Sequence, residues 1–320
     1  MAGLKELRIR ISSIKSTQKI TSAMKMVAAA RLRKAQNLLN DSAPYNQTLI
    51  NSINRVIQEL LEEQKTRKVQ YIFPKIFFSK PESKKHLLLV FSSDRGLCGG
   101  FNVNVAKATT QRMLELERAG KEVKIICVGR KGRDILKRKY SDRILESIEG
   151  IASKGAAYYE AEVIADKVYA MYDKGEIDVL EIVSSEFRSA ISREVTVKQI
   201  LPLTTLNNFP GAPKSEHSEA AVNAEPIAEN LNMSGNALYD YEPDKMEMLM
   251  ALVPQLFSMH IFQAIAHSQA SEQGARMTSM DSATRNARDM ISNLTLKYNG
   301  IRQSAITTEL IEIISGAEAL

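Results

Sequence analysis

A glycine-rich turn with polar neighbours is the segment of this chain best suited to hold a ligand. It reads Phe91-Ser-Ser-Asp-Arg-Gly-Leu-Cys-Gly-Gly-Phe-Asn102 and lies between an apolar run and a helical pattern. Such a turn can hold a phosphate, because backbone amides at a helix N-terminus attract anions. A phosphate loop needs G-x-x-x-x-G-K-[ST], a dinucleotide site needs G-x-G-x-x-G, and this turn has neither spacing. A second, basic turn, Gly129-Arg-Lys-Gly-Arg133, follows another apolar run. A nucleotide-dependent enzyme therefore stays open as one hypothesis.

The remaining reactive side chains form no catalytic pattern. Cys98 could act as a nucleophile, but no histidine is close to it in sequence, and a packed thiol is the simpler interpretation. The four histidines lack metal-ligand spacing, and we expect His260 and His267 to line the packed face of one helix. Two cysteines are too few for a disulfide framework and indicate a reducing compartment. We expect no catalytic residue, metal or cofactor.

Two very long helices are predicted to position these turns. From Ala2 to about Ile57 the only proline is Pro44, and no proline follows Pro254. Helical segments of roughly 55 and 65 residues would extend on the order of 80–100 Å, because a helix rises about 1.5 Å per residue. The first helix enters the middle of the chain and the last leaves it. If they pack together, they form an antiparallel rod standing on a globular base.

Apolar spacing supports this pairing. Leu4, Leu7, Ile11 and Ile14 alternate in steps of three and four, which is a coiled-coil seam. The pattern then slips to Ile20, Met24 and Val27, which predicts irregular packing. The C-terminal helix keeps the three/four spacing from Met280 to Ala305. Beyond that point the apolar residues spread around the helix, so the tip must be covered by something.

The middle of the chain alternates strand and helix patterns. Strands are predicted over 86–93, 122–129, 178–185 and 194–203, and helices over 102–120, 130–140 and 156–172. This alternation predicts a Rossmann-like α/β sheet covered on both faces. The expected organisation is an N-terminal coiled-coil helix over 1–60, an insertion or linker over 61–85, the central α/β domain over 86–206, a flexible loop over 207–240, and a C-terminal coiled-coil helix over 241–320.

Charge is concentrated at the N-terminus. The formal charge is +6, and nine basic residues against one acid lie between residues 2 and 36. This basic arm, with a pI near 9.1, leaves open a nucleic-acid-binding protein as the alternative function, although no known binding module is visible. One apolar window, 249–266, is long enough to suggest a membrane span, but its proline, glutamines and histidine favour a helix buried by protein.

Three sequence blocks carry a resemblance over nearly the whole chain. They are residues 9–30, residues 92–102 and residues 306–317, the last preceded by Ala275-Arg-Met-Thr-Ser-Met280 and Tyr298-Asn-Gly-Ile-Arg-Gln303. In this order they resemble the gamma subunit of the rotary proton-translocating ATP synthase. The segment from Glu62 to Lys85 departs from the shorter family pattern, and the paired regulatory cysteines of the chloroplast form are absent.

The resemblance implies a non-catalytic rotor shaft inside a hexamer of alternating alpha and beta subunits, with catalysis on beta. It implies further contacts with the epsilon subunit and the membrane ring of c subunits, on the cytoplasmic face of a bacterial inner membrane. It places the contact with the alpha/beta hexamer at nine positions: Met24, Lys25, Asp94, Arg95, Cys98, Arg276, Gln303, Thr307 and Glu309. An acidic lever loop of beta is the implied partner of the basic N-terminal face.

Overall fold

The computed structural model describes residues 2–67, 71, 73, 75–77, 83–151, 158–190, 192–203 and 241–318. The loop predicted over 207–240 and much of the predicted insertion lie outside these residues.

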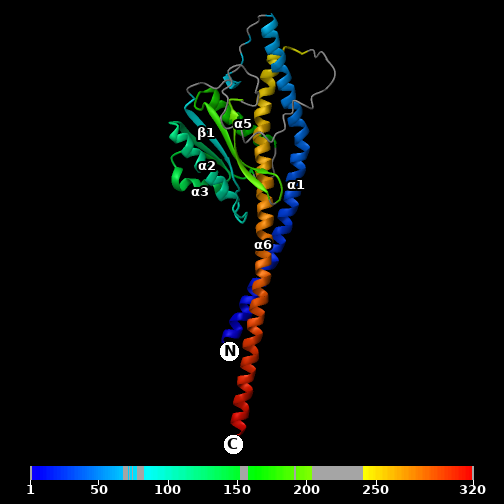
Figure 1. Ribbon diagram of the computed structural model, residues 1–320, viewed down its shortest axis with the longest axis vertical. Helices are drawn as coiled ribbons and strands as arrows, with labels where there is room; N and C mark the ends of the chain where they lie inside the picture. Colours follow the sequence, from blue (N-terminus) through cyan, green and yellow to red (C-terminus); the bar gives the residue numbers. More distant parts are fainter. Residues whose placement is uncertain are drawn as a thin grey trace.

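Two long helices run along the long axis of the molecule, and only the second continues to the C-terminal end of the molecule (Figure 1). Helix α1 runs from Ala2 to Arg67 and helix α6 from Lys245 to Glu318, 66 and 74 residues long. Helix α1 continues through Pro44 and ends seven residues beyond the predicted range of 1–60, whereas α6 continues through Pro254 and lies within the predicted range of 241–320. Both prolines lie on exposed faces. Seven residues of the predicted insertion, 61–67, therefore belong to α1.

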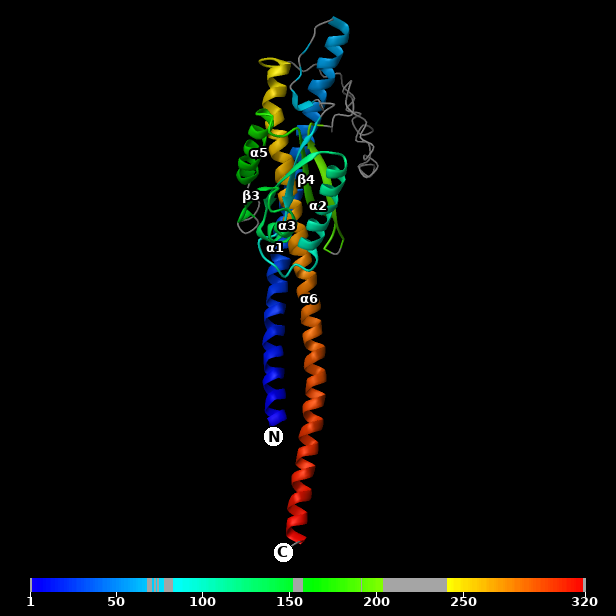
Figure 2. The same ribbon diagram turned by 90° about the vertical axis from the view of Figure 1, so that its left-hand side faces the viewer.

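The two long helices pack antiparallel. Thr284 donates a hydrogen bond to Thr21 at 2.8 Å, and one turn further along α1 the Lys25 ammonium meets Asp281 at 2.6 Å. At the other end, Lys245 pairs with both Glu59 and Glu63. The same register brings the first turn of α1 beside Ile301. Helix α6 therefore extends as a single helix beyond the N-terminus (Figure 2).

The predicted slip of the seam is wrong. Ile20 and Val27 are 60% and 54% exposed, so they face away from α6. The seam instead continues in unbroken steps of three and four, with buried or half-buried side chains at Leu4, Leu7, Ile11, Ile14, Gln18, Thr21, Lys25, Ala28, Leu32 and Ala35. Polar and small residues occupy the middle of this seam. The polar ones, such as Thr21 and Lys25, bind polar partners on α6. A hydrophobicity pattern alone could not reveal this continuity.

A five-stranded sheet lies beside the helix pair. The strands are β1 (Lys85–Phe91), β2 (Glu122–Val128), β3 (Ile144–Ile148), β4 (Val179–Phe187) and β5 (Arg193–Leu201). Their order is β3-β2-β1-β4-β5, and only β5 is antiparallel to its neighbour. Strand β3 was not predicted, because it has only five residues, lies at the edge of the sheet and shows little alternation of buried and exposed side chains. The predicted α/β class is confirmed.

Helices cover both faces of the sheet. On one face, α2 (Phe101–Arg118) and α3 (Arg130–Tyr140) pack on Leu88 and Val90 of β1. On the other, α5 (Tyr158–Asp173) and the two long helices pack on Leu87 and Leu89, and a short 3₁₀ helix, η1 (Lys75–Phe77), joins this core. Because α1 and α6 share this core, the domain flanks the rod instead of standing below it (Figure 1).

The apolar window 249–266 is part of this shared core. By length and composition alone α6 could cross a membrane, but Phe257 and Ile261 are 1% and 0% exposed within the protein. Burial, and then the charge of Lys198, lower the pKa of His260 to about 4, so its imidazole is neutral. His267 accepts the amide of Phe187 through Nδ1 at 3.4 Å. The window is therefore part of a core helix, with a neutral histidine inside it and a hydrogen-bonded histidine directly after it, as its polar residues predicted.

A buried ion pair ties α2 to the sheet. Glu181 on β4 is 2% exposed and accepts two hydrogen bonds of 2.7 Å from Arg112, one from Nε and one from Nη2. His86 on β1 approaches the same carboxylate at 3.5 Å. Burial opposes ionisation of Glu181, but Arg112 and His86 outweigh it, so its pKa lies below the usual value. The sequence reading did not single out this pair.

Gly129 is a position where only glycine fits. Its φ is +108°, and an added Cβ would lie 2.2 Å from the carbonyl oxygen of Ser92. We expect Gly129→Ala to destabilise the chain by about 2–5 kcal/mol, from strained backbone plus overpacking. Gly150→Ala is the matched control, because its φ is +90° and nothing lies within 4 Å of the added Cβ. Urea unfolding should show the larger loss for Gly129→Ala. Equal losses would mean that the contact with Ser92 contributes nothing.

Candidate partner-contact surface of the rod

The glycine-rich turn is held in shape by its own side chains. Asn102, at the start of α2, accepts the amide of Ser93 at 3.0 Å and donates to the Ser93 hydroxyl at 2.7 Å. Leu97 and Gly99 both have positive φ, +64° and +56°. The loop so formed ends in an exposed apolar side chain, since Leu97 is 62% exposed. A strained, exposed leucine on a rigid turn marks a functional surface better than a mobile loop would.

Asp94 joins this turn to the rest of the domain. Its carboxylate accepts the backbone amide of Arg130 at 3.2 Å and that of Gly150 at 3.1 Å. It therefore stabilises the N-terminus of α3, where a negative charge is favoured. The role seen for Asp94 is to hold the turn in place, and a contact with another subunit remains a prediction.

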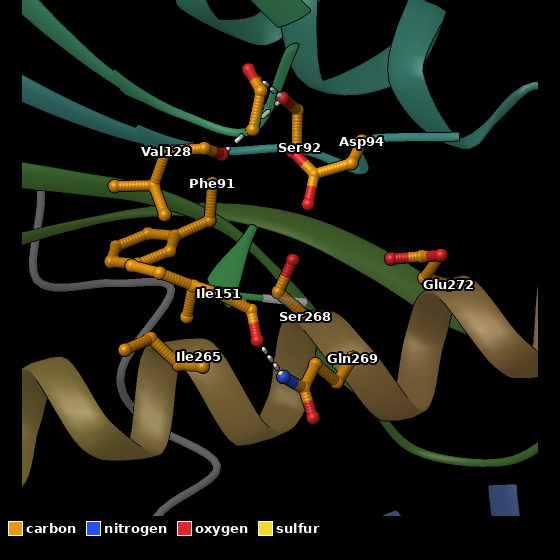
Figure 3. A pocket seen from close by; sticks show the side chains of 10 residues that line it. Phe91, Ser92, Asp94, Val128, Ile151, Ile265, Ser268, Gln269 and Glu272 are labelled. Atoms are coloured by element: carbon orange, nitrogen blue, oxygen red, sulfur yellow. Dashed lines mark hydrogen bonds between the residues drawn. The ribbon is translucent and has the colours of Figure 1, made fainter. Parts of the chain in front are cut away.

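The carboxyl edge of the sheet has no room for a nucleotide among the described residues. In open α/β sheets, ligands bind in the crevice at this edge. Here α6 fills the crevice, and the remaining space of about 10 Å³ lies between the end of β1 and α6 (Figure 3). That volume holds about one water molecule. Gln269 of α6 also donates to the carbonyl of Ile151 across the same edge, at 3.4 Å. This edge of the sheet therefore offers no nucleotide site for the nucleotide-dependent enzyme considered from the sequence.

Cys98 is a packed thiol, as predicted. It is 2% exposed, packs against Phe101 and Ala275, and accepts a hydrogen bond from Asn102 at 3.2 Å. The second cysteine, Cys127, is fully buried, and burial raises the pKa of its thiol to about 12. Both thiols are free. Cys98 holds the turn against α6, and its own side chain offers no surface to a partner.

Arg276 is buried and fastens the turn to α6. Its side chain pairs with Glu272 at 2.7 Å and donates to the carbonyls of Arg95 and Gly96 at 3.3 and 3.2 Å. Burial raises the pKa of Glu272, and the charge of Arg276 only partly offsets this. Arg276 was among the predicted contact residues, but Glu272 was not. A charged i,i+4 pair on a long helix usually faces solvent, so nothing in the sequence singled out Glu272.

An open groove of about 480 Å³ lies between α1, the turn and α6. Its walls combine apolar side chains from α1 with the exposed Leu97, and Met24 lines it half-buried. Arg31 and Arg95 are both exposed and add positive charge at its border. An apolar groove with basic edges fits an amphipathic segment that carries acidic residues.

Lys25, next to Met24, is largely engaged within the rod. Its ammonium is 2.6 Å from Asp281, and this hydrogen bond, with the charge of Arg285, lowers the pKa of Asp281. The positive charge of Lys25 is therefore partly neutralised before any partner arrives. Of the basic N-terminal face, Arg31 is better placed than Lys25 to meet an acidic partner at the groove.

The other three predicted contact residues lie on the single-helix tip of α6. Gln303, Thr307 and Glu309 are exposed, and the Thr307 hydroxyl donates to the Gln303 carbonyl of its own helix at 3.0 Å. Five apolar side chains of the tip are between 49% and 68% exposed: Ile306, Leu310, Ile311, Ile313 and Ile314. The expectation of an apolar tip is confirmed. The predicted site residues thus form two groups, one at the groove and one at the tip.

Comparison with known proteins agrees with this architecture. The family model described as ATP synthase matches residues 3–320. The ATP synthase gamma chains of Paramagnetospirillum magneticum and Rhodospirillum rubrum are each 42% identical over 320 residues, covering both chains completely.

Solved structures share the fold. A chain of the Euglena gracilis mitochondrial ATP synthase, from a structure of OSCP, F1 and the c-ring, aligns with a TM-score of 0.64 at 17% identity, covering 99% of this chain and 94% of that one. A chain from the central stalk and c-ring of the Tetrahymena thermophila enzyme aligns with a TM-score of 0.55 at 23% identity, covering 82% and 99%. At these identities the likeness shows the fold alone. With the full-length matches to bacterial gamma chains, the conclusion is that this chain belongs to the gamma chain family of ATP synthase.

Proposed function

We propose that this chain is the central rotor shaft of an ATP synthase. It couples ion flow through the membrane sector to ATP synthesis or hydrolysis at an alpha/beta hexamer, and it makes no bond itself. The observation that carries the proposal is the shape: a two-helix rod ends in a single helix with exposed apolar side chains, in a chain related over its whole length to gamma chains. Catalysis then takes place on the beta subunits.

The tip and the groove suit two different contacts with the hexamer. Hydrophobic contact is non-directional, so an apolar tip can turn inside an apolar sleeve without one strongly preferred angle. Angle-dependent energy must come from charges and hydrogen bonds. The groove beside Arg31 and Arg95 supplies these, and we assign it to the acidic lever loop of beta.

The further partners follow from the same assignment. The proposed complex holds three alpha and three beta subunits for each copy of this chain. The α/β domain then meets the epsilon subunit and the ring of c subunits, at the cytoplasmic face of a bacterial inner membrane. In support, the related Tetrahymena chain comes from a structure of a central stalk with its c-ring.

The nucleic-acid alternative finds no support in the relatives. The exposed basic residues of α1 are also accounted for by an acidic protein partner. Duplex binding in the micromolar range that weakens steeply with salt would be needed to revive it.

Co-expression with the cognate alpha and beta subunits tests the proposal. We expect native mass spectrometry to find a complex of three alpha, three beta and one copy of this chain. Its ATPase activity should depend on the presence of this chain. The matched control is the same co-expression without the chain. If the chain instead stays alone or forms dimers, and the ATPase activity is unchanged by it, the shaft assignment fails.

A further inference from the structure

In the described part of the chain, several side-chain hydrogen bonds between α6 and the sheet domain lie close together. Four of them are made by neutral side chains: Phe187 to His267, Gln269 to Ile151, Ser271 to Ser185, and Thr278 to Ala190. A further connection is the charged guanidinium of Arg276. Much of the remaining contact is apolar packing, in which interlocked side chains also resist rotation of the helix. The directional bonds add to this packing in fixing the angle of α6 about its own axis relative to the domain.

Arg276 differs from the other four in charge and in connectivity. It donates to two consecutive carbonyls, those of Arg95 and Gly96, while its other nitrogen is held by Glu272 on the preceding turn. Glu272 and Arg276 are 5% and 9% exposed, so solvent screens the arrangement little. Because the guanidinium is planar, fixing one edge on Glu272 fixes the direction of the other edge.

The chain of bonds continues beyond the turn. Asp94, one residue before Arg95, binds the backbone of α3 and of Gly150 on the far side. A continuous hydrogen-bonded path therefore runs from α6 through the turn to α3.

We propose that Glu272 and Arg276 form a latch that fixes the rotational angle of the rod relative to the α/β domain, with Glu272 as a positioning residue. This inference rests on the proposed function for its purpose, because a shaft must pass torque between its rod and its domain. Loss of the latch leaves the fold and raises the angular freedom between the two parts.

The test measures angular freedom in the free full-length chain. Spin labels on Lys137→Cys in α3 and Met290→Cys in α6 report one distance, since both sites are exposed and both native cysteines are buried. We expect the double variant Glu272→Gln, Arg276→Met to widen the distance distribution measurably, because it removes the charge-assisted hydrogen bonds between α6 and the turn. The control Arg285→Met removes another i,i+4 pair of α6, with Asp281, and should leave the width unchanged.

A charge swap separates the latch from a simple ion pair. Glu272→Arg with Arg276→Glu keeps opposite charges but turns a carboxylate toward the carbonyls of Arg95 and Gly96, so the distribution should stay wide. The proposal would be overturned if the charge swap restored the narrow distance distribution. It would also be overturned if the distance distribution of the double variant were no wider than that of the control Arg285→Met.

A second readout uses the assembled rotor. With the hexamer fixed and a bead on the α/β domain, the angular variance of the bead should rise in the double variant and not in Arg285→Met. An unchanged variance in a rotating complex counts against the latch. If the complex rotates neither with the wild-type chain nor with the variants, the result counts against the proposed function. The spin-label distances then remain the test of the latch.

Discussion

Replacing Arg112 with methionine is expected to lower the free energy of unfolding by about 3–5 kcal/mol, which is the usual loss when one partner of a buried ion pair is removed. The carboxylate of Glu181 would remain 2% exposed without its two hydrogen bonds from Arg112. Urea unfolding followed by circular dichroism measures the loss. The double variant Arg112→Met, Glu181→Leu is the control, since an apolar pair of similar volume should recover much of the stability.

The same pair predicts a pH dependence. The pKa of Glu181 in the folded chain lies below its usual value of 4.5, so the stabilisation is present above that pH and is lost as the pH falls through the folded pKa. The difference between wild type and Arg112→Met should therefore be constant near neutral pH and shrink in acid below about pH 4.5. A difference that stays the same into acid would show that the charge of Glu181 is not its source.

Removing the tip is expected to reduce coupled ATP synthesis strongly while sparing the fold. A chain ending at Arg302 loses the exposed residues Ile306 to Ile314, which lie beyond the pairing with α1. Each apolar side chain buried in a sleeve contributes about 1.5–3 kcal/mol. A loss of about 1.4 kcal/mol already lowers a rate tenfold. Loss of several of these apolar contacts should therefore reduce proton-driven ATP synthesis in membrane vesicles by more than about tenfold. The urea midpoint of the α/β domain should not change.

Point variants distinguish the chemistry of the tip from its length. Ile311→Leu with Ile314→Leu keeps the apolar surface and should support synthesis, whereas serine at both positions should reproduce much of the loss. If the truncated chain assembles and supports full proton-driven synthesis, the tip is not required as a bearing.

The sequence predicted the large features of the fold because these rest on long, repeated signals. The four strands and the helices of the central domain were expected close to their observed positions. The apolar runs of β1, β2 and β4 are largely buried and gave a clear signal. The edge strand β3 was missed because its pattern, Ile144-Leu-Glu-Ser-Ile148, is short and half-exposed. The end of the N-terminal helix was predicted at residue 60 but lies at Arg67, and Pro44 and Pro254 are both accommodated on exposed faces within the helices.

The site was only partly predictable. Family motifs pointed to the glycine-rich turn and to Arg276. Glu272 gave no local signal, Arg31 was one of nine basic residues, and Ile20 and Val27 were assigned to the seam although they are exposed. They became recognisable only when the register of α1 against α6 was known. That register depends on polar contacts such as Thr21 with Thr284, which no hydrophobic pattern records. The contact role of the nine predicted residues stays a prediction.

The antiparallel pairing of the first and last helices also constrains how the protein is made. Helix α1 emerges first from the ribosome, yet its seam partner begins only at Lys245. At about 5–20 residues per second, the segment between them takes roughly 10–35 s to translate. During that interval the apolar seam of α1, together with its core residues Ile53 and Leu60, has no partner to cover it. The nascent chain is therefore expected to depend on a chaperone at this stage, and the polar middle of the seam limits how much apolar surface it must shield.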